Sequence, residues 1–161
     1  MTLDQPTVDE RPLLVGVGNR DRGDDGVGPL VVDAINESLS STVDTLVAEG
    51  DLSDLAMRWS GRDRVVVVDA MVSGRAPGSV SVLDGLVDSV PTEESLLSSH
   101  GVGLAEAIEL SRLLGRLPRS LTIIAVEVST TEQFDPVSGP VRSSVLDVVA
   151  LIKAHLGWHQ L

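Results

Sequence analysis

The chain has 161 residues and a formal net charge of −12 at pH 7. Its length suits a single domain with a hydrophobic core, and its acidity argues against nucleic-acid and anionic membrane ligands, whose phosphates it would repel. The sequence contains no cysteine, which excludes disulfides, thiolate nucleophiles and cysteine-ligated metals. The first residues lack the pattern of a signal peptide, and no apolar stretch approaches the ~20 residues of a transmembrane helix. We therefore expect a cytoplasmic protein, and a monomer.

Five segments have the patterns of β-strands. Three continuous apolar runs rich in β-branched residues predict strands buried on both faces of a parallel sheet, namely Leu13–Gly18, Val65–Asp69 and Leu121–Val126. Two further segments, Thr42–Ala48 and Ser79–Leu83, alternate between apolar and polar residues. This alternation predicts weaker strands nearer the edges of the sheet.

Helical periodicity occupies most of the intervening sequence. Apolar residues recur three and four positions apart in four segments, which cover about 27–39, 52–59, 104–115 and 141–157. Strands that alternate with helices predict a three-layer α/β sandwich, with a mostly parallel five-stranded sheet and helices on both faces. We expect residues 1–11 to be a flexible N-terminal tail and residues 12–161 to form the single α/β domain.

The loops that follow the predicted strands are the places to look for a site, because ligands of such sheets bind beyond the carboxyl ends of the strands. The loop after the first strand reads GVGNRDRGDDGVG and places Asp24 and Asp25 just before a helix. A helix cap explains one aspartate but explains a pair less well. A dinucleotide-binding G-x-G-x-x-G loop is excluded, because Asp21 occupies the position of the third glycine.

Two more candidates follow later strands. Asp69 ends a run of four valines, where a carboxylate is costly unless it is hydrogen-bonded or paired, so it either caps a neighbouring loop or belongs to a site. His100 lies in the segment SSHGVG and leads into a helix; taken alone, it also fits a structural or exposed histidine. His155 and His159 have the i, i+4 spacing of a metal pair, but Gly157 lies between them and favours a frayed, solvated end.

Together, three of these residues predict a metal site. Asp25, Asp69 and His100 fall on loops expected at one edge of the sheet. Carboxylates that converge repel each other unless a cation offsets the cost. Two carboxylates and one imidazole suit nickel or zinc, and three protein ligands leave coordination positions open for a substrate.

The segments that carry these residues resemble the signatures of a known family, the hydrogenase maturation endopeptidases. The segment LLVGVGNRDRGDDGVGPLVVDAI resembles the first signature, VVVVDAMVSGRAPGSV the second and SSHGVGLAEAIELSRLLG the third. The three occur in the family's order, and the match covers roughly residues 13–126. After the strand that ends at Val126, relatives tend to carry a proline-containing stretch, whereas this chain has Glu127, Val128 and Ser129. We expect this loop to shape the substrate cleft, with a specificity of its own.

The resemblance implies a fold, a reaction and a site. The implied fold is a sheet between helices, and the implied activity is that of an aspartic-type endopeptidase, which removes the C-terminal extension of a nickel–iron hydrogenase large-subunit precursor. Asp25, Asp69 and His100 correspond to the family's nickel ligands. The nickel is expected to arrive with the substrate as a recognition element, and zinc or cadmium could take its place in crystals. With Asp24 as an orienting residue or general base, the same residues form the expected catalytic site, and no cofactor-binding loop is expected.

Two other functions remain open from the sequence. One is a nickel-sensing maturation chaperone on the same fold, which uses the acidic site without cleaving a peptide bond. The other is an unrelated metal-dependent hydrolase of small molecules. Neither a Ser–His–Asp arrangement nor a thiol stands out in the sequence as the group that attacks the peptide bond.

Overall fold

The computed structural model describes residues 11–39, 42–88, 102–129 and 131–156. Within these ranges one five-stranded sheet has the order β2-β1-β3-β5-β4. Neighbouring strands are parallel, except that β4 runs antiparallel to β5. The strands are β1 (Leu13–Val17), β2 (Asp44–Ala48), β3 (Arg64–Met71), β4 (Val80–Asp84) and β5 (Ser120–Glu127). The predicted fold is confirmed, and the two alternating segments, β2 and β4, are the edge strands.

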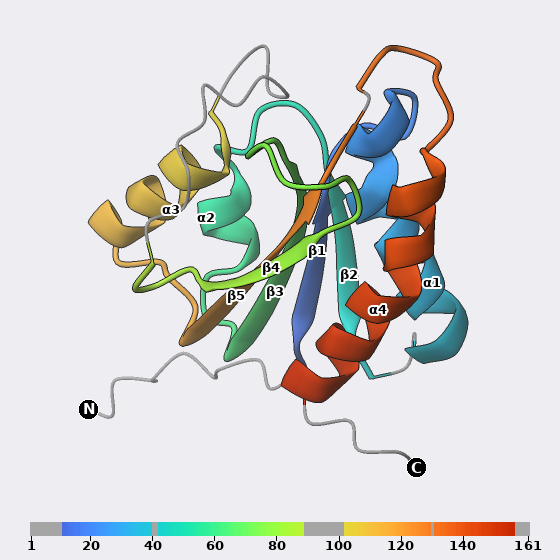
Figure 1. The fold of residues 1–161 in the computed structure, drawn as a ribbon. Helices are drawn as coiled ribbons and strands as arrows, with labels where there is room; N and C mark the ends of the chain where they lie inside the picture. The colour runs from blue at the N-terminus through green and yellow to red at the C-terminus, as the bar shows by residue number, and fades with distance from the viewer. Residues whose placement is uncertain (1–10, 40–41, 89–101, 130, 157–161) are drawn as a thin grey trace, which may run out of the picture.

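Helices cover both faces of the sheet (Figure 1). The helices α1 (Val27–Leu39) and α4 (Gly139–His155) pack on one face, and α2 (Leu55–Arg58) and α3 (Leu104–Leu113) pack on the other. Successive side chains of a strand point to opposite faces, so the valines of β3 contribute alternately to the two cores: Val66 and Val68 to the α1–α4 side, Val65 and Val67 to the α2–α3 side. In the described ranges, no helix is long and apolar enough to span a membrane.

Most elements begin and end within about two residues of their predicted bounds, and for two of them the contacts explain the difference. The second helix is one short turn, Leu55–Arg58, rather than a helix from Leu52. Leu52 is buried, but its N–H donates to the carbonyl oxygen of Val102 at 2.9 Å, and this contact holds it outside the helix. Strand β3 continues beyond Asp69 to Met71, because β5 pairs with it as far as Glu127.

The order of the strands creates one switch point. From β1 the chain first goes to β2 on one side and later to β3 on the other side. Connections that leave β1 and β3 at their carboxyl ends therefore diverge, and this is the position at which ligands of α/β sheets bind. These are the loops on which the sequence placed Asp25 and Asp69.

Candidate functional site

Asp25 lies in the connection between β1 and α1, within a 3-10 turn, η1 (Gly23–Gly26). Its side chain is 6% exposed, and one oxygen accepts a hydrogen bond from the N–H of Asn19 at 2.9 Å. The close approach of the backbone requires glycine at position 18, which has φ of 138° and leaves no room for a Cβ beside the carbonyl of Asp25. Gly18 thus allows the η1 turn to pack closely against the end of β1, which explains a glycine here without a phosphate-binding loop.

The charge environment of Asp25 disfavours its ionised form. Burial raises the pKa of Asp25, and the hydrogen bond from Asn19 and the charge of Arg22 only partly offset this, while the charge of Glu49 raises it further. Glu49 directly follows β2 and is exposed. Glu49 is not among the site residues predicted from the sequence, although it follows a parallel strand, the same pattern that indicated Asp69.

Asp69 lies on β3, a strand that contacts the η1 turn. Strand β1 pairs with β3 only as far as Gly16 and Val68, so Asp69 is the first residue of β3 beyond that ladder. It accepts a hydrogen bond from the N–H of Ala70 at 2.8 Å. Burial and the charge of Asp25 raise the pKa of Asp69 to about 7, against the effect of the Ala70 hydrogen bond. The coupling to Asp25 means that the two predicted ligands do converge, although Asp69 keeps some contact with solvent.

The third predicted ligand, His100, lies outside the described residues. The chain resumes two residues later at Val102, which is held at the carboxyl edge of the sheet: its N–H donates to Asp51 Oδ1 at 3.2 Å and its carbonyl accepts from Leu52. These two hydrogen bonds lower the freedom of the segment just before α3. Among the described residues, no group of three His, Asp or Glu side chains could by itself hold a metal ion. Of the three predicted ligands, the structure describes Asp25 and Asp69.

Asp24 is fully buried and bonds to the connection between β5 and α4. Among the described residues its carboxylate accepts four hydrogen bonds, from the N–H and hydroxyl of Ser129 and from the N–H and hydroxyl of Ser138. Their lengths run from 2.6 to 3.0 Å. We call this arrangement the Asp24 clasp, because it joins η1 to both ends of the loop between β5 and α4. Of the two predicted roles for Asp24, these contacts favour orientation over proton transfer.

Comparison with known proteins bears on the family to which the chain belongs. The family model for hydrogenase maturation protease matches residues 45–155. The hydrogenase 2 maturation protease of Escherichia coli K12 is 32% identical over 120 residues, which are 72% of each chain. This chain belongs to the hydrogenase maturation protease family.

Solved structures of the family have the same fold. An endopeptidase from E. coli superposes with a TM-score of 0.80 at 27% identity and 91% coverage of both chains. The hydrogenase maturating endopeptidase HybD of E. coli superposes with a TM-score of 0.75 at 25% identity, again over 91% of both chains. The predicted family, the α/β sandwich and the class of enzyme, a hydrogenase maturation peptidase, are thereby confirmed.

Glu127 is a further buried acid at this edge of the sheet, and the sequence marked it only as a difference from relatives. Glu127 ends β5 and is 2% exposed. It accepts hydrogen bonds from the N–H of Ser73 at 2.8 Å, the hydroxyl of Ser73 at 2.8 Å and the N–H of Gly74 at 3.0 Å. Burial by itself raises the pKa of Glu127, but the hydrogen bonds from the 73–75 segment together hold it below its ordinary value. Glu127 thus fixes the loop that follows Asp69.

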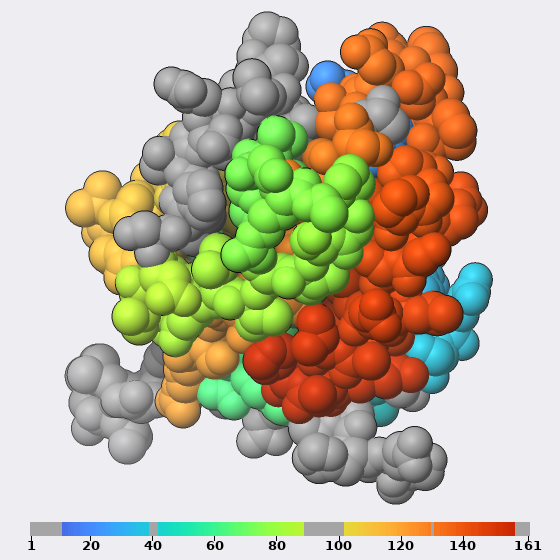
Figure 2. Space-filling view, in the orientation of Figure 1, coloured from blue at the N-terminus to red at the C-terminus, as the bar shows by residue number. Residues whose placement is uncertain are grey.

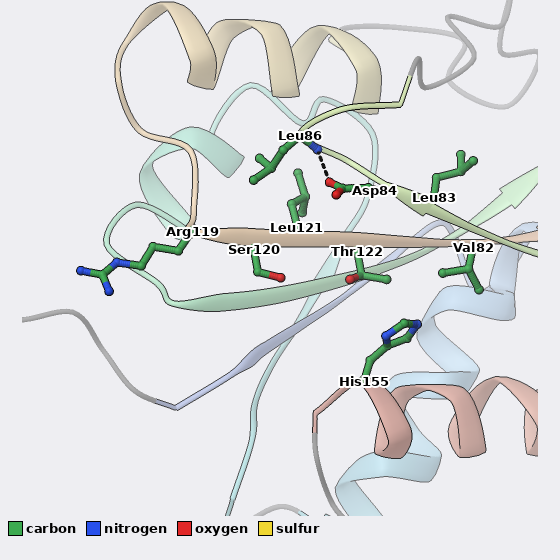
Figure 3. Close-up of a pocket in the computed structure, with 9 residues that line it drawn as sticks. All are labelled: Val82, Leu83, Asp84, Leu86, Arg119, Ser120, Leu121, Thr122 and His155. Carbon is green, nitrogen blue, oxygen red and sulfur yellow. Dashed lines mark hydrogen bonds between the residues drawn. The ribbon is translucent and has the colours of Figure 1, made fainter.

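A hollow of about 380 Å³ lies at the other end of the sheet (Figure 3). It borders the last residues of β4, the first of β5 and the end of α4, and its lining includes Asp84, Arg119, Thr122 and His155. This end carries the amino termini of the parallel strands, so the hollow is remote from the Asp25–Asp69 pair. His155 is exposed there, and His159, which has the i, i+4 spacing from it, lies outside the described residues.

Proposed function

We propose that this family member removes the C-terminal extension of a nickel–iron hydrogenase large-subunit precursor, and that nickel already held by the precursor is the feature it recognises. Asp25, Asp69 and His100 are the proposed ligands. The observation that carries the proposal is the pair of carboxylates at the switch point, whose pKa values are both raised. A divalent cation between them would offset their burial and mutual repulsion.

The chemistry of the pair also fits a metal brought by the substrate. In the described residues each carboxylate accepts one hydrogen bond, from Asn19 or Ala70, which leaves oxygen lone pairs for coordination. Carboxylate and imidazole donors suit nickel and zinc. A site with three protein ligands leaves the remaining positions to groups of the precursor, so nickel could bind only when the correct substrate supplies them.

Asp25 and Asp69 would act mainly by position. Two ligands on different elements, a turn and a strand, would hold the nickel in one place relative to the sheet, and the peptide bond beside it would then be held in register with the enzyme. The nickel could polarise the scissile carbonyl, activate water or act only as a template. Asp24 would orient Asp25 through the clasp, because it fixes the turn on which both residues lie. The monomeric state and the cytoplasmic location stay predictions.

The test compares nickel-loaded with nickel-free precursor from the same genome, incubated with this protein and followed by mass spectrometry. We expect loss of a C-terminal peptide only from the nickel-loaded form. Asp25→Asn and His100→Ala should slow cleavage roughly 100-fold or more, since even residues that only support a ligand are worth 10- to 100-fold. Asp147→Asn, an exposed site on α4, is the matched control and should cleave normally.

Three results would contradict the proposal in different ways. Cleavage of nickel-free precursor at the same rate would remove nickel from the recognition step. Normal processing by a folded Asp25→Asn, His100→Ala double variant would remove these residues from the site. An intact precursor that nevertheless binds the folded wild-type protein would support the nickel-sensing chaperone instead of the peptidase.

A further inference from the structure

The loop between β5 and α4 carries an exposed aromatic residue in a strained conformation. Phe134 is the one phenylalanine of the sequence, and it is 79% exposed. Its φ of 65° makes it the one non-glycine residue of the described chain with positive φ. Phenylalanine rarely adopts this left-handed region, because its Cβ crowds the backbone. Residues held in such conformations concentrate at binding and catalytic sites.

The surrounding structure enforces this conformation. The N–H of Phe134 donates to the carbonyl of Asp21 at 2.5 Å, and the N–H of Gly23 donates to the carbonyl of Asp135 at 3.1 Å. These two bonds join the tip of the loop to the turn that precedes Asp25. The Asp24 clasp fixes the two ends of the same loop. Figures 1 and 2 both show the loop, in orange, against the blue η1 region at one end of the molecule.

Position separates Phe134 from other exposed apolar side chains. Leu113 and Leu146 are about as exposed, at 84% and 78%, but they lie on regular helices, where scattered apolar residues need no explanation. Phe134 follows β5 at the carboxyl edge of the sheet, the edge that holds Asp25 and Asp69. This loop presents an aromatic ring to solvent beside the candidate site. Because the loop is already ordered, little conformational entropy is lost when the ring binds a partner, as in a binding anchor.

We propose that Phe134 is a substrate anchor, which inserts its ring into an apolar recess of the hydrogenase large-subunit precursor next to the segment that is cut. The inference rests on the proposed function and names the residue through which this loop selects its partner.

The test measures cleavage of nickel-loaded precursor over a range of precursor concentrations. Phe134→Ala should raise KM about 30-fold, the size of effect of a hot-spot residue, with kcat unchanged at saturation because the metal pair is intact. Phe134→Tyr keeps the ring and should stay within about threefold of wild type. Leu146→Ala removes an equally exposed side chain from α4 and should leave both constants unchanged.

A second variant separates the ring from the backbone strain. Phe134→Gly removes the ring and also suits the positive φ, so the loop should keep its shape. Equal increases in KM for Phe134→Ala and Phe134→Gly support the anchor, whereas a normal KM for Phe134→Gly would overturn it and leave only a conformational role. If the wild type binds precursor without cutting it, Kd replaces KM in the same comparison. If wild type neither binds nor cuts precursor, the proposed function fails and the anchor fails with it.

Discussion

Asp24 and Asp25 are neighbours in sequence and in the same 3-10 turn, and both are nearly inaccessible to solvent, yet their surroundings differ. Asp24 accepts four hydrogen bonds from two serines that lie more than 100 positions later in the sequence. Asp25 accepts one among the described residues, and its pKa is raised. Burial alone therefore does not distinguish an acid that fixes the structure from one with oxygens left for a ligand. The number of hydrogen-bond donors around each carboxylate distinguishes them.

The ends of β3 and β5 repeat this comparison. Glu127, at the end of β5, is held by the N–H groups and hydroxyl of the 73–74 segment, and its pKa is lowered. Asp69, near the end of the adjacent strand β3, accepts one hydrogen bond and has a pKa of about 7. In each pair one acid is saturated and fixes a loop, and the other is left with free coordination capacity. Asp24 and Glu127, whose oxygens accept several hydrogen bonds, hold the segments that carry or adjoin Asp25 and Asp69.

The largest expected effect on stability comes from Asp24→Asn. The amide keeps one acceptor oxygen but turns an NH₂ group toward backbone N–H donors, so buried donors of Ser129 and Ser138 lose their partner. We expect the free energy of unfolding to fall by about 3 kcal/mol, and the melting temperature to fall by roughly 6–12 °C. Urea denaturation and thermal melts, both followed by circular dichroism, measure the two quantities.

Asp25→Asn is the matched control for that variant, because it makes the same chemical change one residue later. It removes a buried charge that accepts one hydrogen bond, so its stability should equal or exceed that of wild type. A loss as large as that of Asp24→Asn would contradict the distinction between the two acids. Activity should respond to both, through metal binding for Asp25 and through the orientation of the turn for Asp24.

A smaller effect, with a defined pH dependence, is expected for Glu127→Gln. A lowered pKa in the folded state means that Glu127 stabilises the protein above its unfolded pKa of ~4.3. That stability is lost as the pH falls through the lower folded pKa. We expect Glu127→Gln to reduce the free energy of unfolding by about 2 kcal/mol at pH 7. The difference from wild type should shrink below pH 4, and urea titrations at several pH values measure it.

Ser73→Ala gives a second reading of the same contact. It removes the hydroxyl that donates to Glu127 but keeps both backbone donors, so it should lower the free energy of unfolding by about 1 kcal/mol.

A Glu127→Gln protein whose stability differs from wild type by the same amount at pH 3 and pH 7 would show that the charge of Glu127 does not hold the loop.

Sequence patterns predicted the fold well because they follow from burial. The valine run of β3 is buried on both faces, and the alternating segments became the edge strands β2 and β4. The bounds of α2 were predicted poorly, because Leu52 has the apolar spacing of a helix but is bonded to Val102, a residue 50 positions away. Periodicity reports which residues are buried, and it does not report such distant backbone contacts.

The site was predictable to the extent that it depends on strand ends. Asp69 and Asp25 follow parallel strands, so their convergence could be expected from topology. The resemblance gave Asp24 and Asp25 different roles, but the hydrogen bonds of Asp24 could not be predicted, because their donors lie in a loop beyond residue 128. Glu127 has the same sequence signal as Asp69, an acid after an apolar run, and only the contacts with Ser73 and Gly74 identify it as a loop anchor.

Asp69→Asn is expected to give a small change in stability with the opposite sign to that of Asp24→Asn and Glu127→Gln. Burial and the charge of Asp25 raise the pKa of Asp69 to about 7, so its ionised form destabilises the metal-free protein. The side chain keeps some contact with solvent, which reduces the cost. A neutral amide should therefore raise the free energy of unfolding by about 1 kcal/mol and the melting temperature by about 2–4 °C, measured at pH 8 with EDTA. The same variant should not cleave precursor, because an amide is a poor replacement for a charged metal ligand. A loss of stability instead would show that Asp69, like Glu127, is a structural acid. The proposed metal site would then need another carboxylate, and Glu49 is a candidate because its charge raises the pKa of Asp25.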